Sequence, residues 1–290
     1  MTSILTNSSA MSALQTLRSI NSNLTDTQNR VSSGMRVEQA SDNVAYWSIS
    51  TSMKSDNKAL GAATDALGVG AAKVDTAYAA MDSAIDVVNE IKAKLVTSSE
   101  TSVDKEQIQL EVKKLQEQLS AIGQAASFNG ENWMVNTTNT TVVDGFIRES
   151  DGTVKINTAS FKAGSYAMFS TIDGGVGSGG ILGAVMTIEL TSVTTQGKID
   201  TFLDTVETAL GKMTNGAAAL GALKTRIDMQ DKFSSKLSDA IESGVSRLVD
   251  ANMEEESARL SALQTQQQLA IQSLSIANSS SQNIMSLFRG

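Results

Sequence analysis

The chain contains no proline in 290 residues, and this absence constrains its fold more than any single motif does. At an ordinary usage of about 5%, a chain of this length would carry roughly fourteen prolines. Proline removes a backbone N–H and breaks helix interiors, so its absence permits long, unbroken helices. It also removes slow cis–trans isomerisation from refolding, which would suit a chain that must unfold, travel and refold. Chance in a helix-rich chain explains the composition equally well.

Apolar and small residues recur at helical spacing near both ends of the chain. Residues 3–33 carry a heptad stripe diluted by Asn21 and Gln28, and residues 251–288 carry a second stripe that includes Gln267. Each stripe is too thin to stabilise a lone helix, so each predicts a partner helix. The main candidate residues of this assembly seam are Leu14, Leu17, Leu24, Val31, Met253, Leu260, Leu263, Leu274, Ile284 and Phe288.

Three further helices are predicted between the two ends, over residues 42–98, 103–127 and 198–249, from their apolar spacing. The first of these would be roughly 80 Å long, more than a compact globular domain needs. The order of elements is nearly symmetric about the middle of the chain. The predicted fold is therefore mainly α, with long paired terminal helices forming a coiled-coil-like rod and a small β-rich insertion at its tip.

The insertion spans residues 135–197 and differs in composition from the rest of the chain. Short runs of Thr, Val and Ile flank an Asp-Gly pair at 151–152, which predicts a β-hairpin. Residues 181–193, ILGAVMTIELTSV, are interpreted as strand. The stretch GVGSGG at 175–180 matches the glycine pattern of dinucleotide sites, but the βαβ unit that such sites require is missing. A flexible surface loop is the better interpretation of these glycines.

The stretch VSSGMRVEQASDNVAYWSIS, residues 31–50, interrupts the helical pattern about thirty residues from the start. Gly34 is suited to the left-handed conformation in which many helices end. Ser41 followed by Asp42 predicts an N-cap with an acidic residue in the first turn of the next helix. The sequence thus predicts a non-helical joint between two helices.

Composition also excludes several classes of function. The chain has no His and no Cys, which rules out serine triads, thiol catalysis and the usual zinc sites, and leaves only carboxylate- or lysine-based chemistry open. Glu254, Glu255 and Glu256 are consecutive, so on a helix they diverge, and a solvated first turn is a better interpretation than a metal site. We expect no enzyme activity, no cofactor and no metal site.

Charge and hydropathy argue against two kinds of partner. A formal net charge of −8 and an isoelectric point near 4.7 do not suit nucleic acid. No run of about 20 apolar residues predicts a membrane span. The first residues lack the basic region, apolar stretch and cleavage site of a secretory signal peptide, so the protein either stays inside or leaves by another route.

The terminal stripes leave two interpretations open. They fit an antiparallel coiled coil within one monomer. They also fit a polymer, because small and amide residues on several faces allow several neighbours to approach closely. Two amide-rich seams would make a weak pair on their own, which favours assembly.

Several of these stretches together resemble bacterial flagellin. Residues 31–50 resemble the family's LSSG-x-RI-x-x-A-x-DDAAG stretch without a gap, and SFNGENW resembles its FNG turn. LVDANMEEESARLSALQTQQQLAIQSLSIANSSSQNIMSLFRG resembles its C-terminal signature. The likeness covers most of residues 1–135 and 198–290, and its variants are similar to flagellins of rhizobia and other alphaproteobacteria. One departure stands out: Tyr46, followed by Trp47, occupies the position of the family's glycine.

The resemblance implies a structural subunit that self-assembles into the helical filament of the bacterial flagellum, with a hook–filament junction protein as the alternative. Residues 1–40 with 251–290 would form an inner tube, 41–134 with 198–250 a surrounding shell, and 135–197 a variable outer domain. The joint, with Gly34, Arg36, Ser41 and Asp42, would be the spoke between tube and shell. Expected partners are other copies, an export chaperone and the junction and cap proteins. Export would run through the flagellar channel to the cell exterior without a cleaved signal peptide.

Overall fold

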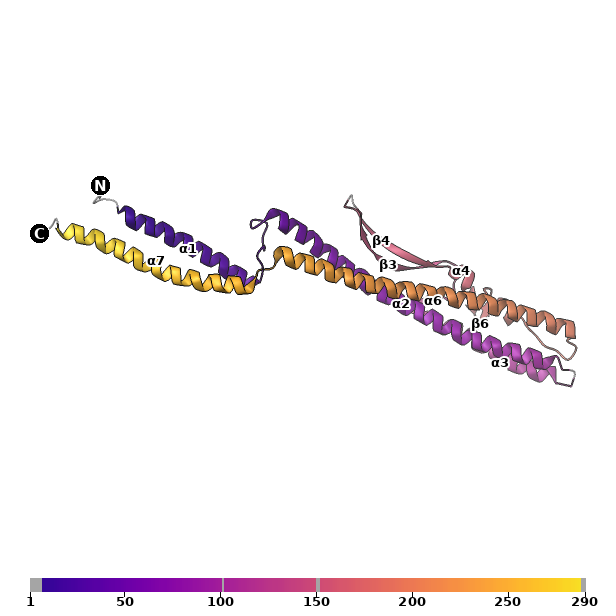
Figure 1. Ribbon diagram of the computed structural model, residues 1–290. Helices are drawn as coiled ribbons and strands as arrows, with labels where there is room; N and C mark the ends of the chain where they lie inside the picture. Colours follow the sequence, from indigo (N-terminus) through magenta and orange to yellow (C-terminus); the bar gives the residue numbers. More distant parts are fainter. Residues whose placement is uncertain (1–6, 101, 150–151, 288–290) are drawn as a thin grey trace. The chain divides into compact units, whose positions relative to one another are not determined.

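The computed structural model describes the backbone of residues 7–100, 102–149 and 152–287, and the side chains among these up to residue 279. It confirms a mainly α fold, with long terminal helices and a small strand-containing insertion between them (Figure 1). The long helices are α1 (Ser8–Ser33), α2 (Val44–Ser98), α3 (Lys105–Ala125), α6 (Gln196–Val249) and α7 (Met253–Leu287). Within the described ranges, no helix has a stretch long and apolar enough to cross a membrane.

The chain forms two compact units, which are described separately. The terminal unit comprises residues 1–57 and 240–290, and the central unit comprises residues 58–239. The division falls inside α2 and α6, so each of these helices contributes residues to both units.

The core of the central unit is built on two heptad stripes. Fully buried residues recur every seven positions on α2 and on α6, and each of them is at most 2% exposed. They belong to one apolar cluster, to which α3 adds Ile108, Val112 and Leu119. Burying each such side chain contributes about 1.5–3 kcal/mol, which stabilises helices this long. The stripe residues are Leu67, Val74, Met81, Val88 and Leu95 on α2, and Ile199, Val206, Met213, Leu220 and Ile227 on α6.

Ion pairs connect α2 to its neighbours in the central unit. Lys94 pairs with Glu111 of α3 at 2.6 Å, and Asp75 pairs with Lys224 of α6 at 2.5 Å. All four side chains are more than a third exposed, so solvent screens both pairs. The pairs therefore orient the helices more than they stabilise them.

The insertion holds short two-stranded antiparallel sheets and two single-turn helices. The predicted hairpin is confirmed as β3 paired with β4, although Asp151 of its Asp-Gly pair lies outside the described residues. The elements are β1 (Ser127–Phe128), β2 (Glu131–Asn132), β3 (Thr140–Arg148), β4 (Val154–Phe161), α4 (Ala163–Tyr166), β5 (Thr171–Asp173), β6 (Val176–Ser178) and α5 (Gly183–Met186). The pairs are β1–β2, β3–β4 and β5–β6.

Two expectations for the insertion were wrong. Residues 181–193 form α5 and irregular chain rather than a strand, because the buried amide of Gln116 donates hydrogen bonds to the carbonyls of Val185 and Ile188 at 3.0 and 3.1 Å. These carbonyls need no partner strand. The glycine-rich stretch is not a surface loop throughout, since Gly177 is buried in β6. A Cβ there would lie 2.4 Å from the ring of Phe169, so this glycine permits close packing.

Candidate functional site

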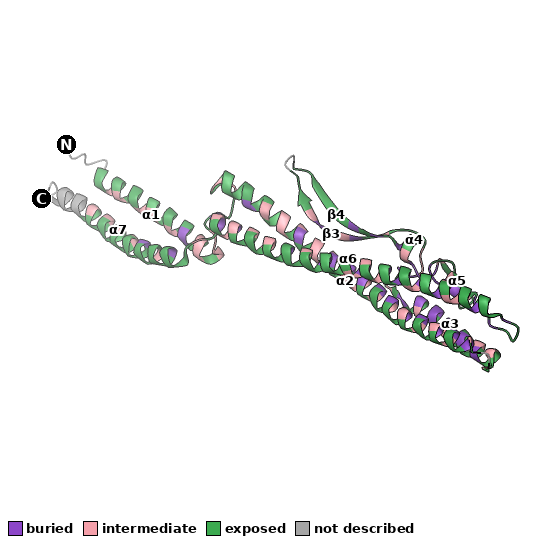
Figure 2. Cartoon of the chain, turned by 45° about the vertical axis from the view of Figure 1, so that its right-hand side comes forward, coloured by how far each residue is buried: buried purple, intermediate pink, exposed green. Residues whose placement is uncertain are grey.

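The candidate functional site is the pair of terminal helices, α1 and α7, which lie side by side and antiparallel in the terminal unit (Figure 1). Figure 2 shows that most of their surface is exposed and that burial is confined to one side of each helix. The inward residues of α7 recur at steps of three and four, as a heptad seam requires. They are Glu256, Leu260, Leu263, Gln267, Ala270, Leu274 and Ala277 on α7, facing Ala10, Ala13, Leu17, Ile20, Leu24, Thr27 and Val31 on α1.

The predicted seam residues divide into three groups. Six of them lie on the inward faces: Leu17, Leu24, Val31, Leu260, Leu263 and Leu274. Leu14 and Met253 lie outside this seam, at 38% and 42% exposed. The side chain of Ile284, and the whole of Phe288, lie outside the described residues.

Three inward residues of α1, Ala13, Ile20 and Thr27, were missed from the sequence. The predicted stripe ran through Leu14, Asn21 and Gln28, each one residue later than these three. The error began at Leu14, which was preferred to the smaller Ala13, and steps of seven then led to Asn21 rather than Ile20. The buried threonine, 3% exposed, carries no apolar signal.

Polar contacts accompany the seam along its length. Near one end, the amide of Asn7 donates to the carbonyl of Ala277 at 2.9 Å while its oxygen accepts the N–H of Ala10 as the N-cap of α1. Near the middle, Gln267 donates to the side chain of Asn21 at 2.7 Å. The amides that dilute the apolar stripe thus bond across the helix pair.

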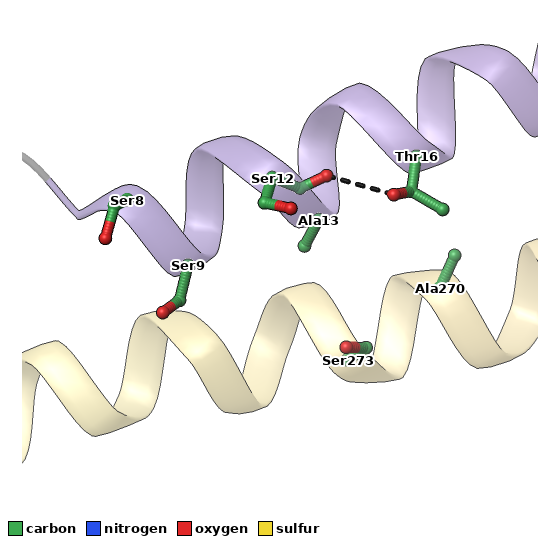
Figure 3. Close-up of a pocket in the computed structure, with 7 residues that line it drawn as sticks. All are labelled: Ser8, Ser9, Ser12, Ala13, Thr16, Ala270 and Ser273. Atoms are coloured by element: carbon green, nitrogen blue, oxygen red, sulfur yellow. Dashed lines mark hydrogen bonds between the residues drawn. The ribbon is translucent and has the colours of Figure 1, made fainter.

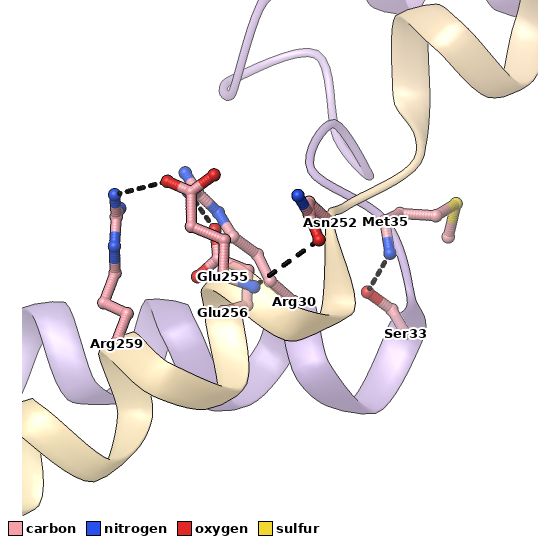
Figure 4. Close-up of polar contacts among 7 residues, drawn as sticks. All are labelled: Arg30, Ser33, Met35, Asn252, Glu255, Glu256 and Arg259. Atoms are coloured by element: carbon pink, nitrogen blue, oxygen red, sulfur yellow. Dashed lines mark hydrogen bonds and ion pairs between the residues drawn. The ribbon is translucent and has the colours of Figure 1, made fainter.

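An ion pair lies at the other end of the seam, near the start of α7 (Figure 4). Arg30 and Glu256 approach to 3.3 Å, and their side chains are 36% and 8% exposed. The second carboxylate oxygen of Glu256 is buried and has no hydrogen-bond partner among the described residues. The prediction of a solvated first turn was therefore wrong for Glu256, because an arginine of α1 packs over it. Among the described residues, no group of acidic side chains has the geometry of a metal site.

At the opposite end, small side chains line an open groove along α1 and α7 (Figure 3). Its lining consists of Ser8, Ser9, Ser12, Ala13, Thr16, Ala270 and Ser273. Such residues leave the two backbones accessible, so another helix could approach closely here.

The predicted joint is present, and backbone hydrogen bonds connect it to the segment between α6 and α7. α1 ends at Ser33 and is capped by Gly34, whose φ of +71° is left-handed and whose N–H donates to the carbonyl of Arg30. Backbone N–H groups of Arg36 and Val37 both donate to the carbonyl of Val249, at 2.6 and 3.2 Å. The N–H of Ala251 donates back to Gly34 at 2.9 Å. The break after α1 and the break before α7 are therefore one hydrogen-bonded crossing.

The N-cap of α2 is Asn43 rather than Ser41. The Asn43 side chain accepts the N–H of Tyr46 at 3.0 Å, and α2 begins at Val44. Asp42 lies before the helix, where its carboxylate accepts the N–H groups of Glu38 and Gln39, each at 3.0 Å. Ser41 and Asn43 could both cap this helix, and the two hydrogen bonds of Asp42 to Glu38 and Gln39 keep the residue between them in the loop.

These two hydrogen bonds make the joint sensitive to acid. The bonds from Gln39 and then Glu38 hold the pKa of Asp42 below its ordinary value. A carboxyl with a lowered folded-state pKa stabilises the fold above its unfolded pKa, about 3.9, and this stability is lost as the pH falls through the folded pKa. We expect the amide proton shifts of Glu38 and Gln39 to titrate with a midpoint below about 3.9, and not to titrate in Asp42→Ala. A midpoint at or above that value would contradict this assignment.

Family models match both ends of the chain. Residues 4–139 match the bacterial flagellin N-terminal helical region, and residues 203–288 match the bacterial flagellin C-terminal helical region. Flagellin C of Rhizobium meliloti (strain 1021) is 47% identical over 320 aligned positions, and the flagellin of Brucella melitensis biotype 1 is 49% identical over 292. Both alignments cover 100% of each chain.

One solved structure shares the fold at low sequence identity. It is a Vibrio parahaemolyticus chain whose assignment as a flagellar hook-associated protein is itself provisional. It superposes with a TM-score of 0.54 at 11% identity, covering 72% of this chain and 100% of that one. At this identity the likeness concerns the fold alone.

Proposed function

Because the chain belongs to the bacterial flagellin family, and is therefore a non-enzymatic structural subunit of the extracellular flagellar filament, we propose that its α1–α7 pair supplies the main contacts between copies. The resemblance noted in the sequence is thereby confirmed at the level of the family. The junction-protein alternative is not favoured, since it is supported only by a fold likeness.

The observation that carries this proposal is the apolar surface that the helix pair leaves uncovered. Outside the seam, six large apolar side chains on α1 and α7 are 38–70% exposed. Exposed apolar surface of this extent marks a protein interaction site. Since members of this family assemble with themselves, we expect other copies to cover it. The six are Met11, Leu14, Met253, Leu269, Ile271 and Ile276.

The same proposal assigns each part of the chain to one layer of the filament. Residues 1–40 and 251–290 would form the inner tube, 41–134 and 198–250 the shell, and 135–197 the outer domain. The hydrogen-bonded crossing at Gly34 and Ala251 supports a boundary between the first two layers. The stretch without a family match, 140–202, supports a variable outer domain. Gly34, Arg36, Ser41 and Asp42 would then belong to the spoke.

Export and the remaining partners complete the proposal. The chain would leave through the flagellar channel without a cleaved signal peptide, carried by an export chaperone, and would meet the junction and cap proteins during assembly. The support for this is the membership of the family.

Seeded growth tests the proposed function. Purified monomer mixed with short filament seeds should extend them into long tubes of uniform width, as seen by electron microscopy. The Ile271→Ser variant should extend seeds poorly, because it removes an outward apolar side chain that is 53% exposed in one copy. Gln272→Ser, one residue further along, is the matched control and should grow normally. Short rings would point to a junction protein, and equal growth of the two variants would remove α7 from the interface.

A further inference from the structure

Residues 140–202, which neither family model matches, contain two segments that differ in their contacts with the helices. We call residues 146–157, the loop half of the β3–β4 hairpin, the distal hairpin. Residues 168–194, which include β5, β6 and α5, are called the α3-bound segment. No described residue of the distal hairpin is buried, whereas seven apolar side chains of the α3-bound segment are at most 8% exposed. They are Met168, Phe169, Ile181, Leu182, Val185, Ile188 and Leu190.

The α3-bound segment is part of the core of the central unit. Its seven buried side chains belong to the same apolar cluster as the heptad stripes of α2 and α6. Phe169 is fully buried, and a Cβ added to Gly123 of α3 would lie 3.0 Å from its ring. The surface of α3 therefore fits this ring closely. Since apolar burial of this kind stabilises the long helices, the segment contributes to their stability as a further helix would.

Four side chains along one face of α3 bind backbone groups of the same segment. They follow one another at steps of four, seven and four residues, and their partners follow in the reverse order along the chain. Backbone groups that would bond to a neighbouring strand in a sheet thus bond to a helix. Lys105 donates to the Thr194 carbonyl (2.8 Å), Gln109 accepts the Leu190 N–H (2.7 Å), Gln116 donates to the Val185 and Ile188 carbonyls (3.0 and 3.1 Å), and Ser120 accepts the Gly177 N–H (3.1 Å).

The distal hairpin lies beyond the last anchored residues of β3. The side chain of Val142 fills the space beside Gly70 of α2, where a Cβ would lie 1.8 Å from it. Asp144 pairs with Arg226 of α6. From residue 146 to residue 157, no described apolar side chain belongs to the core cluster or packs against it. A two-stranded hairpin without such packing is marginally stable by itself, so it contributes little to the stability of the unit.

The apolar side chains of the distal hairpin do not alter this comparison. Ile147, Val154 and Ile156 are 44%, 49% and 64% exposed in the single chain. Lys155 pairs with Glu149 of the same hairpin at 2.6 Å. Removing these residues therefore takes little apolar surface out of the core of the monomer.

We infer that the α3-bound segment is a fixed part of the shell, and that the distal hairpin is the part of residues 140–202 that can be shortened or exchanged without loss of the fold. The inference rests on the proposed function and narrows the outer layer proposed for residues 135–197. Gln116 is a positioning residue in this arrangement, because it holds the chain around α5 against α3.

Two matched truncations test the division in the monomer. Gly145 and Asn157 lie opposite one another in the β3–β4 ladder, as Thr171 and Ser178 do in the β5–β6 ladder. In each ladder, Asn-Gly can join the opposite residues as a two-residue turn. The first truncation removes the residues from 146 to 156, and the second removes only those from 172 to 177.

The longer truncation should have the smaller effect. It should change the melting temperature of the central unit, followed by circular dichroism, by less than about 2 °C. The shorter one should lower it by about 5 °C or more, because it removes the half-buried Ile172 and the Gly177 N–H that Ser120 accepts. Equal shifts, or the reverse order, would overturn the inference.

A point substitution tests the polar contacts of α3 separately. Gln116→Leu removes the side-chain donor of the Ile188 carbonyl, in a residue 1% exposed, and should lower the same melting temperature by about 3 °C or more. Gln118→Leu, at an exposed position of α3, is the matched control and should change it by less than about 2 °C. A shift no larger than that of the control would overturn the positioning role of Gln116. These measurements use the monomer, so failure of the natural chain to extend seeds would overturn only the proposed function.

Discussion

Replacing Leu263 by aspartate is expected to abolish filament growth while the central unit stays folded. Among the described side chains of α1 and α7, Leu263 is the only apolar one that is buried, at 8% exposed. The substitution loses about 2 kcal/mol of apolar burial and places a charged group at a buried position, where desolvation is costly. The other described apolar side chains of the seam are only half-buried, so they cannot compensate. Electron microscopy of seeded growth measures the loss, and circular dichroism checks that residues 58–239 still melt cooperatively.

Leu269→Asp provides the matched control, six residues further along the same helix. Leu269 is 58% exposed and outside the seam, so the same change should leave the helix pair of the monomer intact. Limited proteolysis of the monomer separates the two cases: both termini should be trimmed faster in Leu263→Asp and at the natural rate in Leu269→Asp. Normal filaments from Leu263→Asp would refute the seam.

The second large effect is expected from Arg30→Met, and it should be asymmetric. This change leaves the buried carboxylate of Glu256 without its counter-charge, which typically costs about 3 kcal/mol. Removing the other partner instead, by Glu256→Gln, should cost about 1 kcal/mol or less, because more than a third of the Arg30 side chain is already hydrated. The double variant Arg30→Met/Glu256→Leu should recover most of the loss, since an apolar pair can replace a buried ion pair. The urea concentration at which protease protection of α1 and α7 is lost measures each variant.

A second ion pair on the same turn of α7 serves as the comparison. Arg259 and Glu255 also approach to 3.3 Å, but their side chains are 50% and 64% exposed (Figure 4). Arg259→Met should therefore cost about 0.5 kcal/mol or less. If Arg30→Met and Arg259→Met lose protease protection at the same urea concentration, burial of Glu256 has no energetic consequence and the predicted asymmetry is wrong.

Sequence periodicity was sufficient for the fold because the long helices obey simple rules. Strict steps of seven, as from Leu67 to Leu95 and from Ile199 to Ile227, place one face inward whatever the rest of the chain does. The terminal seam was harder to predict from the sequence. Where small, amide and hydroxyl residues fill inward positions, as Ala13 and Thr27 do, apolar size no longer indicates direction, so the register of α1 was predicted partly one residue out.

Two of the remaining errors depend on a partner distant in sequence. Glu256 is buried because Arg30 lies over it, 226 residues earlier in the chain. Val185 and Ile188 need no partner strand because Gln116 satisfies their carbonyls. The third error is local: Asn43 rather than Ser41 caps α2, and the carboxylate of Asp42 accepts the N–H groups of Glu38 and Gln39 instead.

The crossing formed by Gly34, Met35, Val249 and Ala251 has an evolutionary consequence. The chain departs from its terminal helices and returns to them through the same few backbone hydrogen bonds, so the distance between departure and return is fixed whatever number of residues lies between. Backbone groups make these bonds, and they tolerate changes of side chain. Natural selection can therefore lengthen, shorten or exchange the middle of the gene without changing its two ends, and the alignment of one relative with these 290 residues needs gaps to reach its 320 positions.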